Sequence, residues 1–318
     1  MKNPRYSIII PHHNVPDLLK RLLDTIPHRN DTEIIIVDDN SDPSIVDFNH
    51  FPGSDRDDVV LRFDKKGGYG GYARNIGLSI AKGEWILFAD SDDFFTYCFN
   101  EILDDCYSID DGVDLVFFPA CSLDSVTYTN TNRAQHLKKM IDGYSYIDKD
   151  RYELLLRYKF GEPWCKLARK NMIDNYDIRF EERSIHNDTA YSYLVGFYAR
   201  EISVCQKAIY CITDRNASVS KVLTESKKLE RIENFGTSAL FFKRHNIPIK
   251  ENRHFEQLFE CYCTNTDTFK KGMLLLQKLG YKESYIKKKL IRIAMTYVKK
   301  RLIKLVKISI KAKGIKIL

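Results

Sequence analysis

Three carboxylates fall within four residues at Asp90-Ser91-Asp92-Asp93, directly after the apolar run Trp85–Ala89. Carboxylates this close repel one another unless a cation lies among them. Mg²⁺ and Mn²⁺ prefer oxygen ligands, and they leave coordination positions for the phosphates of a substrate. The cluster therefore predicts a divalent-metal site for a phosphate-bearing substrate. The alternative is an acidic loop in which Asp93 caps the following helix.

Two further polar groups follow apolar runs in the same way. Asp38-Asp39 comes after Ile34–Val37, and Pro11-His12-His13-Asn14 comes after Ile8–Ile10. An acid at the end of a strand can accept hydrogen bonds from a nucleobase or from ribose hydroxyls. Asp, Asn and Ser residues also favour a tight turn, and both interpretations of Asp38-Asp39 can hold together.

A glycine-rich run precedes a predicted helix and leads to Arg74. Gly68, Gly70 and Ala73 form G-x-G-x-x-A, a near match to the dinucleotide fingerprint, so a nicotinamide-dependent oxidoreductase using Gly68–Gly71 is one alternative. That fingerprint belongs after the first strand of its fold, whereas this run follows the third predicted strand. A loop that delivers Arg74 to a diphosphate fits equally well, because a guanidinium matches phosphate geometry.

Two downstream segments add candidate residues. Asp188 stands before an apolar helical run, where it either caps the helix or faces a cleft as a general base. Trp164 and Lys166 lie close together in the chain. Core burial is the default for a tryptophan, and a platform that stacks on a sugar is the sharper alternative. Both pairs of interpretations stay open at the level of sequence.

Alternating strand-like and helix-like segments must position these residues. Apolar runs predict strands, and helical spacing of Leu, Ile and Ala predicts helices between them. Strands are expected at 6–10, 33–37, 59–63, 85–89 and 115–118, with helices at about 16–26 and 71–81. Strands that are apolar throughout indicate a mostly parallel sheet covered by helices on both faces. Their carboxyl ends share one edge, so the three polar groups are expected to meet there.

The rest of the chain shows three patterns. Residues 124–150 are rich in Thr, Asn and Asp and are interpreted as an exposed excursion. Regular structure resumes over 151–212, with a helix expected at 189–199, and successive helices are expected beyond about residue 224. The predicted organisation is a domain over 1–215, with halves 1–120 and 121–215, followed by a helical C-terminal extension over 216–318.

Composition places the chain among ordinary globular proteins. It has 318 residues, 44% hydrophobic and 29% charged, which excludes collagen-like and wholly disordered classes. Its 8 cysteines include no C-x-x-C pair, so free thiols in a reducing cytosol are expected rather than a zinc ribbon or a disulfide scaffold. No apolar run has the length of a signal-peptide core or of a spanning helix. We expect a cytoplasmic protein, or one that rests on a membrane surface.

The charge is distributed unevenly along the chain. The net charge is +7, yet residues 282–318 carry 13 Lys/Arg and one acid, a net charge of +12, while the preceding 281 residues carry −5. Apolar residues at helical spacing, such as Ile286, Leu290 and Ile293, run through this basic tail. A basic amphipathic helix favours an anionic membrane surface, and packing of the helix on the body is the alternative. Nucleic-acid binding is not expected, because no nucleic-acid motif is present.

Five of these segments occur together in an order and spacing that is specific. They are Ser7–Asn14, Ile34–Ser41, Ala73–Gly77, Ala81–Glu84 and Phe88–Asp93. In this order they resemble family 2 glycosyltransferases with the A-type fold, an α/β, Rossmann-like fold with a mostly parallel sheet flanked by helices. The resemblance is strong over about residues 5–120, weaker over 160–215, and absent beyond about 220.

The resemblance implies a nucleotide-diphospho-sugar donor and a divalent metal, Mn²⁺ or Mg²⁺. Pro11, His13 and Asn14 would contribute to the nucleotide pocket, although family members often place an aromatic residue where His13 stands. Asp39 would contact the base, and Arg74 would lie near the diphosphate. UDP is the nucleotide that the family tendency favours.

The resemblance also implies roles for the remaining candidates. Asp90 and Asp92 would form the Asp-x-Asp motif of the donor and metal site, with Asp92 as the direct metal ligand. Trp164 and Lys166 belong to a segment that resembles the lining of the acceptor site. Asp188 would be the catalytic base, although the residue before it is Asn where the family usually has Glu.

The reaction that the resemblance implies is an inverting transfer of a sugar to a hydroxyl of a glycan or lipid-linked saccharide. The products would be bacterial capsule, O-antigen or related surface polysaccharides, made in the cytoplasm with the enzyme at the inner face of the membrane through its basic tail. A non-catalytic protein that binds nucleotide sugars is a further alternative beside the oxidoreductase. The sequence does not predict the sugar, the linkage or the oligomeric state.

Overall fold

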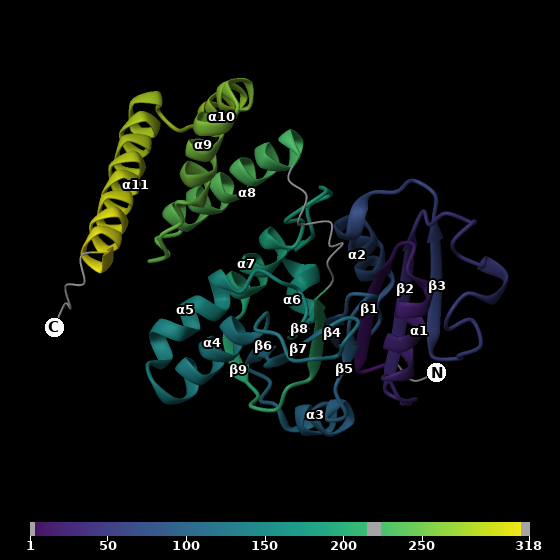
Figure 1. Ribbon diagram of the computed structural model, residues 1–318. Helices are drawn as coiled ribbons and strands as arrows, with labels where there is room; N and C mark the ends of the chain where they lie inside the picture. Colours follow the sequence, from purple (N-terminus) through teal and green to yellow (C-terminus); the bar gives the residue numbers. More distant parts are fainter. Residues whose placement is uncertain (1–3, 215–223, 313–318) are drawn as a thin grey trace. The chain divides into compact units, whose positions relative to one another are not determined.

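The contacts among its residues divide the chain into two units, Met1–Lys221 and Val222–Leu318. The computed structural model describes residues 4–214 and 224–312, with side chains up to residue 299. In Figure 1 the described part of the first unit combines strands and helices, and that of the second unit is made of helices.

The first unit is built on a seven-stranded sheet with the strand order β3-β2-β1-β4-β8-β6-β9. β8 runs antiparallel to its neighbours β4 and β6, and the other neighbouring pairs are parallel. The strands are β1 Tyr6–His12, β2 Thr32–Asp39, β3 Val59–Asp64, β4 Trp85–Phe88, β6 Val113–Phe117, β8 Lys166–Arg169 and β9 Glu201–Val204. The predicted mostly parallel sheet is confirmed, and each of the five expected strands is present.

The first strand of a second, smaller sheet follows β4 closely in the chain. This sheet brings residues from much later in the sequence close to the end of β4. Its strand order is β5-β10-β7, with β10 antiparallel to β5 and parallel to β7. The strands are β5 Phe94–Phe95, β7 Ala120–Asp124 and β10 Tyr210–Asp214. β5 follows the acidic cluster directly, so its partner β10 is held close to that cluster.

Helices flank the strands of the first unit (Figure 1). They are α1 Pro16–Asp24, α2 Tyr69–Ile80, α3 Phe99–Asp105, α4 Gln135–Tyr146, α5 Lys149–Lys159, α6 Lys170–Asn175 and α7 Thr189–Tyr198, with short 3₁₀ turns η1 Phe48–His50 and η2 Cys106–Ser108. α1 begins at a proline, which suits a first helical turn because its missing N–H needs no partner there. α2 packs closely on β1: a Cβ on Gly77 would lie 2.4 Å from Cγ2 of Ile9.

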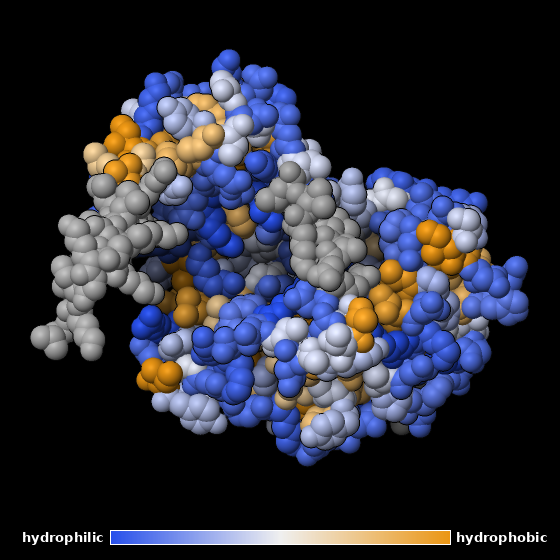
Figure 2. Space-filling view, in the orientation of Figure 1, coloured by the Kyte–Doolittle hydropathy of each residue, from blue (hydrophilic) through white to orange (hydrophobic). Residues whose placement is uncertain are grey.

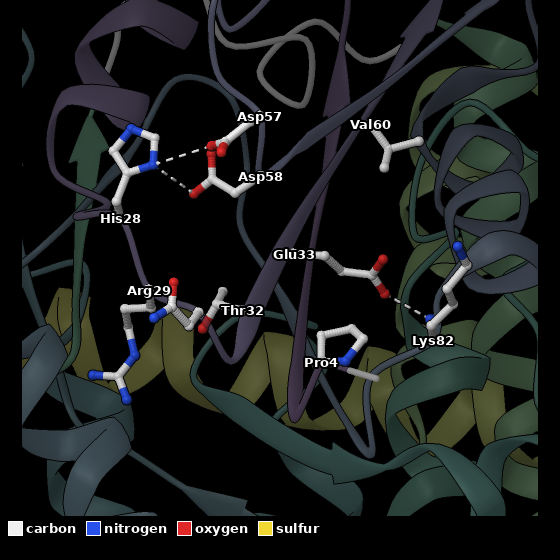
Figure 3. A pocket seen from close by; sticks show the side chains of 10 residues that line it. Pro4, His28, Arg29, Thr32, Glu33, Asp57, Asp58, Val60 and Lys82 are labelled. Carbon is white, nitrogen blue, oxygen red and sulfur yellow. Dashed lines mark hydrogen bonds and ion pairs between the residues drawn. The ribbon is translucent and has the colours of Figure 1, made fainter. Parts of the chain in front are cut away.

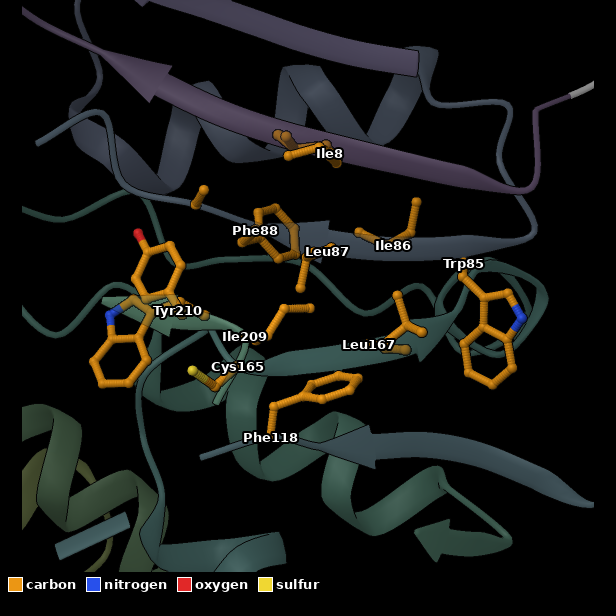
Figure 4. Close-up of a cluster of buried hydrophobic side chains, with 14 of the residues drawn as sticks. Ile8, Trp85, Ile86, Leu87, Phe88, Phe118, Cys165, Leu167, Ile209 and Tyr210 are labelled. Carbon is orange, nitrogen blue, oxygen red and sulfur yellow. The ribbon is translucent and has the colours of Figure 1, made fainter. Parts of the chain in front are cut away.

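The core of the first unit lies between the sheet and these helices. Ile8, Phe88 and Leu167, from the adjacent strands β1, β4 and β8, are almost fully buried. Figure 4 shows them gathered with Phe118 and Ile209. Each fully buried side chain of this size contributes about 1.5–3 kcal/mol to stability, so these strands form a rigid base for the loops at their ends.

Residues 124–150 are mostly exposed, as their composition predicts, but they are not irregular throughout. α4 and the first residues of α5 occupy about half of the segment, and most of the irregular part lies between β7 and α4. Leu137 and Ile141, four residues apart on α4, are buried. Two apolar positions at helical spacing are enough to dock a helix, but the surrounding polar residues conceal them in the sequence.

The second unit is a group of helices with its own apolar core. The helices are α8 Glu225–Arg244, α9 Arg253–Thr264, α10 Thr266–Lys278 and α11 Glu283–Ala312. Its core consists of Ile232, Phe255, Leu258, Cys261, Leu276 and Ile286. Within the described ranges, no helix combines the length and the apolarity needed to cross a membrane.

Candidate active site

The three polar groups predicted to meet at one sheet edge do so. β1 lies between β2 and β4 and is parallel to both, so the carboxyl ends of these strands are neighbours. A pocket of about 200 Å³ opens there. Its lining comes from all three strand ends and from the start of α2: Pro11, His12, His13, Val15, Asp39, Gly70, Asp90, Ser91 and Asp92.

A buried hydrogen-bond network fixes the turns after β1 and β2. His12 Nδ1 lies 2.8 Å from Asp38 Oδ2, and the N–H of Val15 donates to His12 Nε2 at 3.3 Å. Nε2 therefore accepts, and Nδ1 carries the proton that is donated to Asp38. Ser41 donates to Asp38 from both its hydroxyl and its N–H, at 2.6 and 3.0 Å. Burial acts to raise the pKa of Asp38, but these hydrogen bonds outweigh it and lower that pKa.

Of the residues predicted to bind the nucleotide, Pro11, His13 and Asp39 form one wall of the pocket, whereas Asn14 and Arg74 do not line it. Asp39 is held by the N–H of Gly68, which donates to its Oδ1 at 2.8 Å. His13 Nδ1 lies 2.9 Å from the carbonyl oxygen of Asp39, and His13 Nε2 lies 3.0 Å from Asn14 Nδ2. Asn14 accepts in turn from the N–H of Asp42 at 2.7 Å. The turns after β1 and β2 are thus joined into one rigid edge, with Asp39 facing the pocket.

The acidic cluster offers oxygen atoms at a spacing that suits a metal ion. One carboxylate oxygen from each of Asp90, Asp92 and Asp93 lies within 4.8 Å of the others. Asp93 is buried and accepts from the N–H of Thr213 at 2.7 Å. Burial, together with the negative charges of Asp92 and Asp90, raises the pKa of Asp93 well above its usual range. Hard oxygen donors, two of them lining the pocket, fit Mg²⁺ or Mn²⁺.

Arg74 connects this cluster to the segment before α7. Its Nη2 donates to Asp90 Oδ1 at 2.5 Å, and its Nη1 donates to Asn187 Oδ1 at 3.2 Å. The guanidinium lies over the ring of Phe180, 5.4 Å from the centroid. The buried Arg74 therefore ties Asp90 to the residue that precedes Asp188.

Asp188 precedes α7 without capping it, because its side chain makes no hydrogen bond to the first turn of the helix. Burial raises the pKa of Asp188 to about 6, the positive charge of Arg74 opposes that rise, and the negative charges of Glu162 and Asp90 add to it. A carboxylate whose pKa lies near neutral pH is suited to accept a proton from a hydroxyl. The raised pKa is compatible with a general base, and that role stays a prediction, because Asp188 does not line the pocket of the acidic cluster.

Trp164 and Lys166 both lie in the interior. The Lys166 ammonium donates to the carbonyl oxygens of Phe160 and Glu162, each at 2.7 Å, and burial lowers the pKa of Lys166 to about 7. Trp164 stacks on Tyr210 with the ring centroids 5.8 Å apart. Both side chains contact other groups of the protein, and the burial of Trp164 agrees with the interpretation of this residue as part of the core. Contact of either residue with an acceptor stays a prediction.

Sequence analysis missed three residues that support the acidic cluster. The N–H of Asp90 donates to the Tyr210 hydroxyl at 2.8 Å. The carbonyl oxygen of Asp92 accepts from Thr213 Oγ1 at 2.6 Å and from Arg21 Nη2 at 2.5 Å. Tyr210 and Thr213 reach the site through β10, more than 100 residues further along the chain, and no local motif marks them.

The glycine-rich run is not a dinucleotide fingerprint. The helix after the first strand is α1, whereas Gly68 precedes α2, after the edge strand β3. Gly71 serves a packing role: a Cβ there would lie 2.2 Å from the carbonyl oxygen of Glu181 and 2.9 Å from Cβ of Asn187. Glycine at this position lets α2 approach the segment that leads to Asp188.

Replacing Gly71 with alanine is expected to destabilise the first unit by about 1–3 kcal/mol, because the added methyl overlaps a backbone oxygen. Denaturant unfolding measures the loss. Gly161→Ala is the matched control, since no heavy atom lies within 4 Å of a Cβ built there. Equal stability of the two variants would contradict the packing role of Gly71.

A larger pocket of about 630 Å³ lies at the opposite edge of the sheet, near the amino ends of β1 and β2 (Figure 3). His28 Nδ1 lies 3.6 Å from Asp57 and 3.5 Å from Asp58. Arg56 donates to both oxygens of Asp58, at 2.9 and 2.7 Å. Glu33 accepts from the N–H of Lys82. The polar groups of this region interact with one another and stabilise the sheet edge. We therefore do not assign this pocket as the candidate active site.

Comparison with known proteins adds independent findings. Residues 7–176, more than half of the chain, match the family described as glycosyl transferase family 2. The chain is 40% identical over 95 residues to the poly(ribitol-phosphate) beta-glucosyltransferase of Bacillus spizizenii, covering 28% of this chain and 15% of that protein. It is 26% identical over 281 residues to the putative glycosyltransferase EpsH of Bacillus subtilis, covering 85% of this chain and 75% of that protein.

The fold is also similar to that of a solved structure. S. aureus TarS, residues 1–349 in complex with UDP-GlcNAc, superposes with a TM-score of 0.59 at 21% sequence identity, covering 80% of this chain and 71% of that chain. The chain spans only 15% of the length of the Bacillus spizizenii relative.

Proposed function

The chain belongs to glycosyl transferase family 2, and from that premise we propose that it moves a sugar from a UDP-sugar to a hydroxyl group of a glycan or lipid-linked saccharide, with inversion at the anomeric carbon. The observation that carries the proposal is the pocket in which Asp39, Asp90 and Asp92 meet. UDP is supported by the complex of TarS with UDP-GlcNAc. A surface polysaccharide as product is supported by the relative that glucosylates poly(ribitol-phosphate).

A divalent metal ion is part of the proposal, with Asp92 and Asp90 as its ligands. Their carboxylate oxygens fit such an ion, as does the third oxygen from Asp93. When bound, the metal would offset negative charge on the departing diphosphate. Mn²⁺ and Mg²⁺ are both compatible with an oxygen donor set.

The nucleotide is proposed to occupy the wall formed by the turns after β1 and β2. Asp39, fixed by Gly68, would accept a hydrogen bond from the base. Pro11 and His13 would line the base, with Asn14 holding the turn that carries them. Arg74 would present its charge toward the diphosphate from beside Asp90. Because these groups are already held by hydrogen bonds, little ordering would be needed when the donor binds.

Asp188 is proposed as the general base. The acceptor hydroxyl oxygen forms a bond to the anomeric carbon, the bond from that carbon to the diphosphate oxygen breaks, and the hydroxyl proton passes to the Asp188 carboxylate. A single displacement of this kind inverts the configuration. Support comes from the raised pKa of Asp188 and from the Asn187–Arg74–Asp90 connection beside it.

A panel of nucleotide sugars with Mn²⁺, with and without candidate acceptors, tests the proposal. Release of UDP that depends on both a donor and an acceptor is the expected result. A protein that only binds nucleotide sugars would show donor affinity without UDP release. An oxidoreductase would bind a nicotinamide dinucleotide in the absence of metal and release no UDP from any donor.

We further propose that α11 holds the enzyme on an anionic membrane surface. One face of α11 packs inside the second unit through Ile286, Leu290 and Ile293. The start of the basic tail therefore belongs to the fold of this unit, as the packing alternative predicts. A second face is open, so packing and membrane contact are compatible.

The open face of α11 carries apolar residues beside basic ones. Ile291, Met295 and Val298 are 56%, 67% and 55% exposed and lie at helical spacing. Figure 2 shows apolar side chains, in orange, over the part that Figure 1 labels α10 and α11. Lys288 and Lys299 flank this row and are exposed. Each basic residue near an anionic surface adds about 1 kcal/mol of attraction.

Replacing Ile291, Met295 and Val298 together with serine is expected to abolish flotation with phosphatidylglycerol vesicles, because the row loses its apolar surface while the charge is kept. Deleting 282–318 is a poorer test, since it removes Ile286 from the core. Leu274→Ser with Tyr262→Ser, two exposed positions on α10 and α9, is the matched control. Unchanged flotation of the triple variant would exclude this face as the membrane contact.

A further inference from the structure

The second unit contains a groove that the proposed reaction does not use. A cavity of about 560 Å³ opens among the end of α8, the start of α9 and the start of α11. A cavity of about 470 Å³ shares Asn252, Phe255 and Lys289 with it and continues between α9 and α11 as far as Tyr297. The two cavities form one groove, the α9–α11 groove.

Positive charge dominates the lining of the α9–α11 groove. Five cations and two acids contribute to it. Within the described part of the chain, no carboxylate pairs with Lys243, Lys282 or Arg292. The buried acid of the larger cavity, Glu251, is already neutralised, because Arg253 donates to both of its oxygens at 2.6–3.0 Å. Concave surfaces with one sign of charge concentrate ligands of the opposite sign, so the groove favours an anion.

Aromatic rings form the wall beside these cations. Tyr281 is fixed by its hydroxyl, which donates to the carbonyl oxygen of Gly236 at 2.8 Å. The rings of Tyr281 and Tyr285 are nearly parallel, with centroids 6.5 Å apart. The Lys289 ammonium lies 5.7 Å from the ring centroid of Phe255 and 5.4 Å from that of Tyr285. Fixed ring faces next to a cation suit a ligand that carries both a ring with an apolar face and a negative group.

His254 lies in the wall of the larger cavity, next to Tyr281 and Phe255. Its side chain is 1% exposed, and neither ring nitrogen has a hydrogen-bond partner among the described residues. Burial lowers the pKa of His254 to about 4, so the ring is neutral at physiological pH. Both nitrogens are closed off from solvent, so the neutral ring forms part of the cavity wall and does not contact the ligand itself.

We propose that the α9–α11 groove binds a phosphorylated sugar, with the phosphate against Lys243 and Lys282 and the sugar ring against Tyr281 and Tyr285. The groove is concave, so it suits a small ring-bearing ligand better than a flat lipid surface. In the cell the ligand would be a phosphate-bearing segment of the acceptor, a role that rests on the proposed transferase function. The binding itself does not depend on that function.

Calorimetric titration of glucose 6-phosphate into the full-length protein tests this site. Binding of glucose 6-phosphate is expected. Inorganic phosphate should bind more weakly, because it lacks the sugar ring, and glucose more weakly still, because it lacks the phosphate. The double variant Lys243→Gln/Lys282→Gln should weaken glucose 6-phosphate binding about tenfold or more, through the loss of two charge-assisted contacts. Lys270→Gln/Lys278→Gln, two exposed lysines of α10 that do not line the groove, is the matched control and should bind like the parent.

A second readout reports on the groove alone. The His254 ring signals in proton NMR should shift on addition of glucose 6-phosphate to the parent and to the control, and not in Lys243→Gln/Lys282→Gln. Equal affinity of the two double variants would overturn the site. Vesicle binding that depends on Lys243 and Lys282, without glucose 6-phosphate binding, would also overturn it. UDP release measured on the same proteins separates the two proposals, since transfer can succeed where groove binding fails.

Discussion

Replacing Asp188 with asparagine is expected to slow sugar transfer by about 10²–10⁴-fold, because the acceptor hydroxyl loses the group that takes its proton. Donor affinity should stay close to that of the parent, since Asp188 acts on the acceptor and asparagine keeps its shape. Steady-state release of UDP measures the rate, and calorimetry with a non-transferable donor measures the affinity. Full activity of Asp188→Asn would remove Asp188 from the mechanism.

The pH dependence of transfer provides a check on the same residue. Burial raises the pKa of Asp188 to about 6, so its carboxylate becomes the minor form below that pH. The rate should therefore fall as the pH decreases through 6 and level off above it. Glu162→Gln is an informative companion, because the charge of Glu162 contributes to raising the pKa of Asp188. That variant should keep the plateau rate and move the midpoint to lower pH.

Replacing Asp92 with alanine is expected to remove metal-dependent binding of the donor. Substituting a residue that hydrogen-bonds to a metal ligand typically lowers metal affinity or activity by about 10–100-fold. Loss of a direct ligand should lower metal affinity at least as much. Calorimetry of UDP binding with and without Mn²⁺ measures the effect. In the parent, a chelator should reduce transfer strongly, whereas transfer by Asp92→Ala should be low with or without it.

Asp57→Ala is the control for the Asp92 experiment. Asp57 belongs to the other acidic group of the described residues, at the opposite edge of the sheet, and its substitution changes the net charge equally. It should leave Mn²⁺-dependent UDP binding unchanged. Unchanged UDP affinity of Asp92→Ala in the presence of Mn²⁺ would refute the role of Asp92 as a ligand.

Sequence reasoning reached the strand-end residues because their positions follow from local rules. Parallel apolar strands must end at a common edge, so Asp39 and Asp90 were predicted to meet from spacing alone. Their convergence in one pocket confirms that prediction. For residues 124–150, composition predicted the exposure but not the helix α4, which is docked by the buried Leu137 and Ile141.

The supporting residues of the site could not be predicted in the same way. Tyr210 and Thr213 bond the acidic cluster only because β10 pairs with β5, the strand directly after the cluster. Nothing near Tyr210 or Thr213 in the sequence marks that pairing. The burial of Trp164 against Tyr210 likewise depends on elements far apart in the chain.

By itself the sequence determined the parallel sheet, the acidic strand ends and the charge of the tail, since these follow from residue types at short range. Only the tertiary structure decided how Arg74 joins Asp90 to Asn187, and which face of α11 is buried at Ile286 and which is open at Ile291. The physical reason is that hydrogen bonding and burial depend on which surfaces meet. Segments distant in sequence provide those surfaces, and the spacing of residues within one segment does not predict which segments will meet.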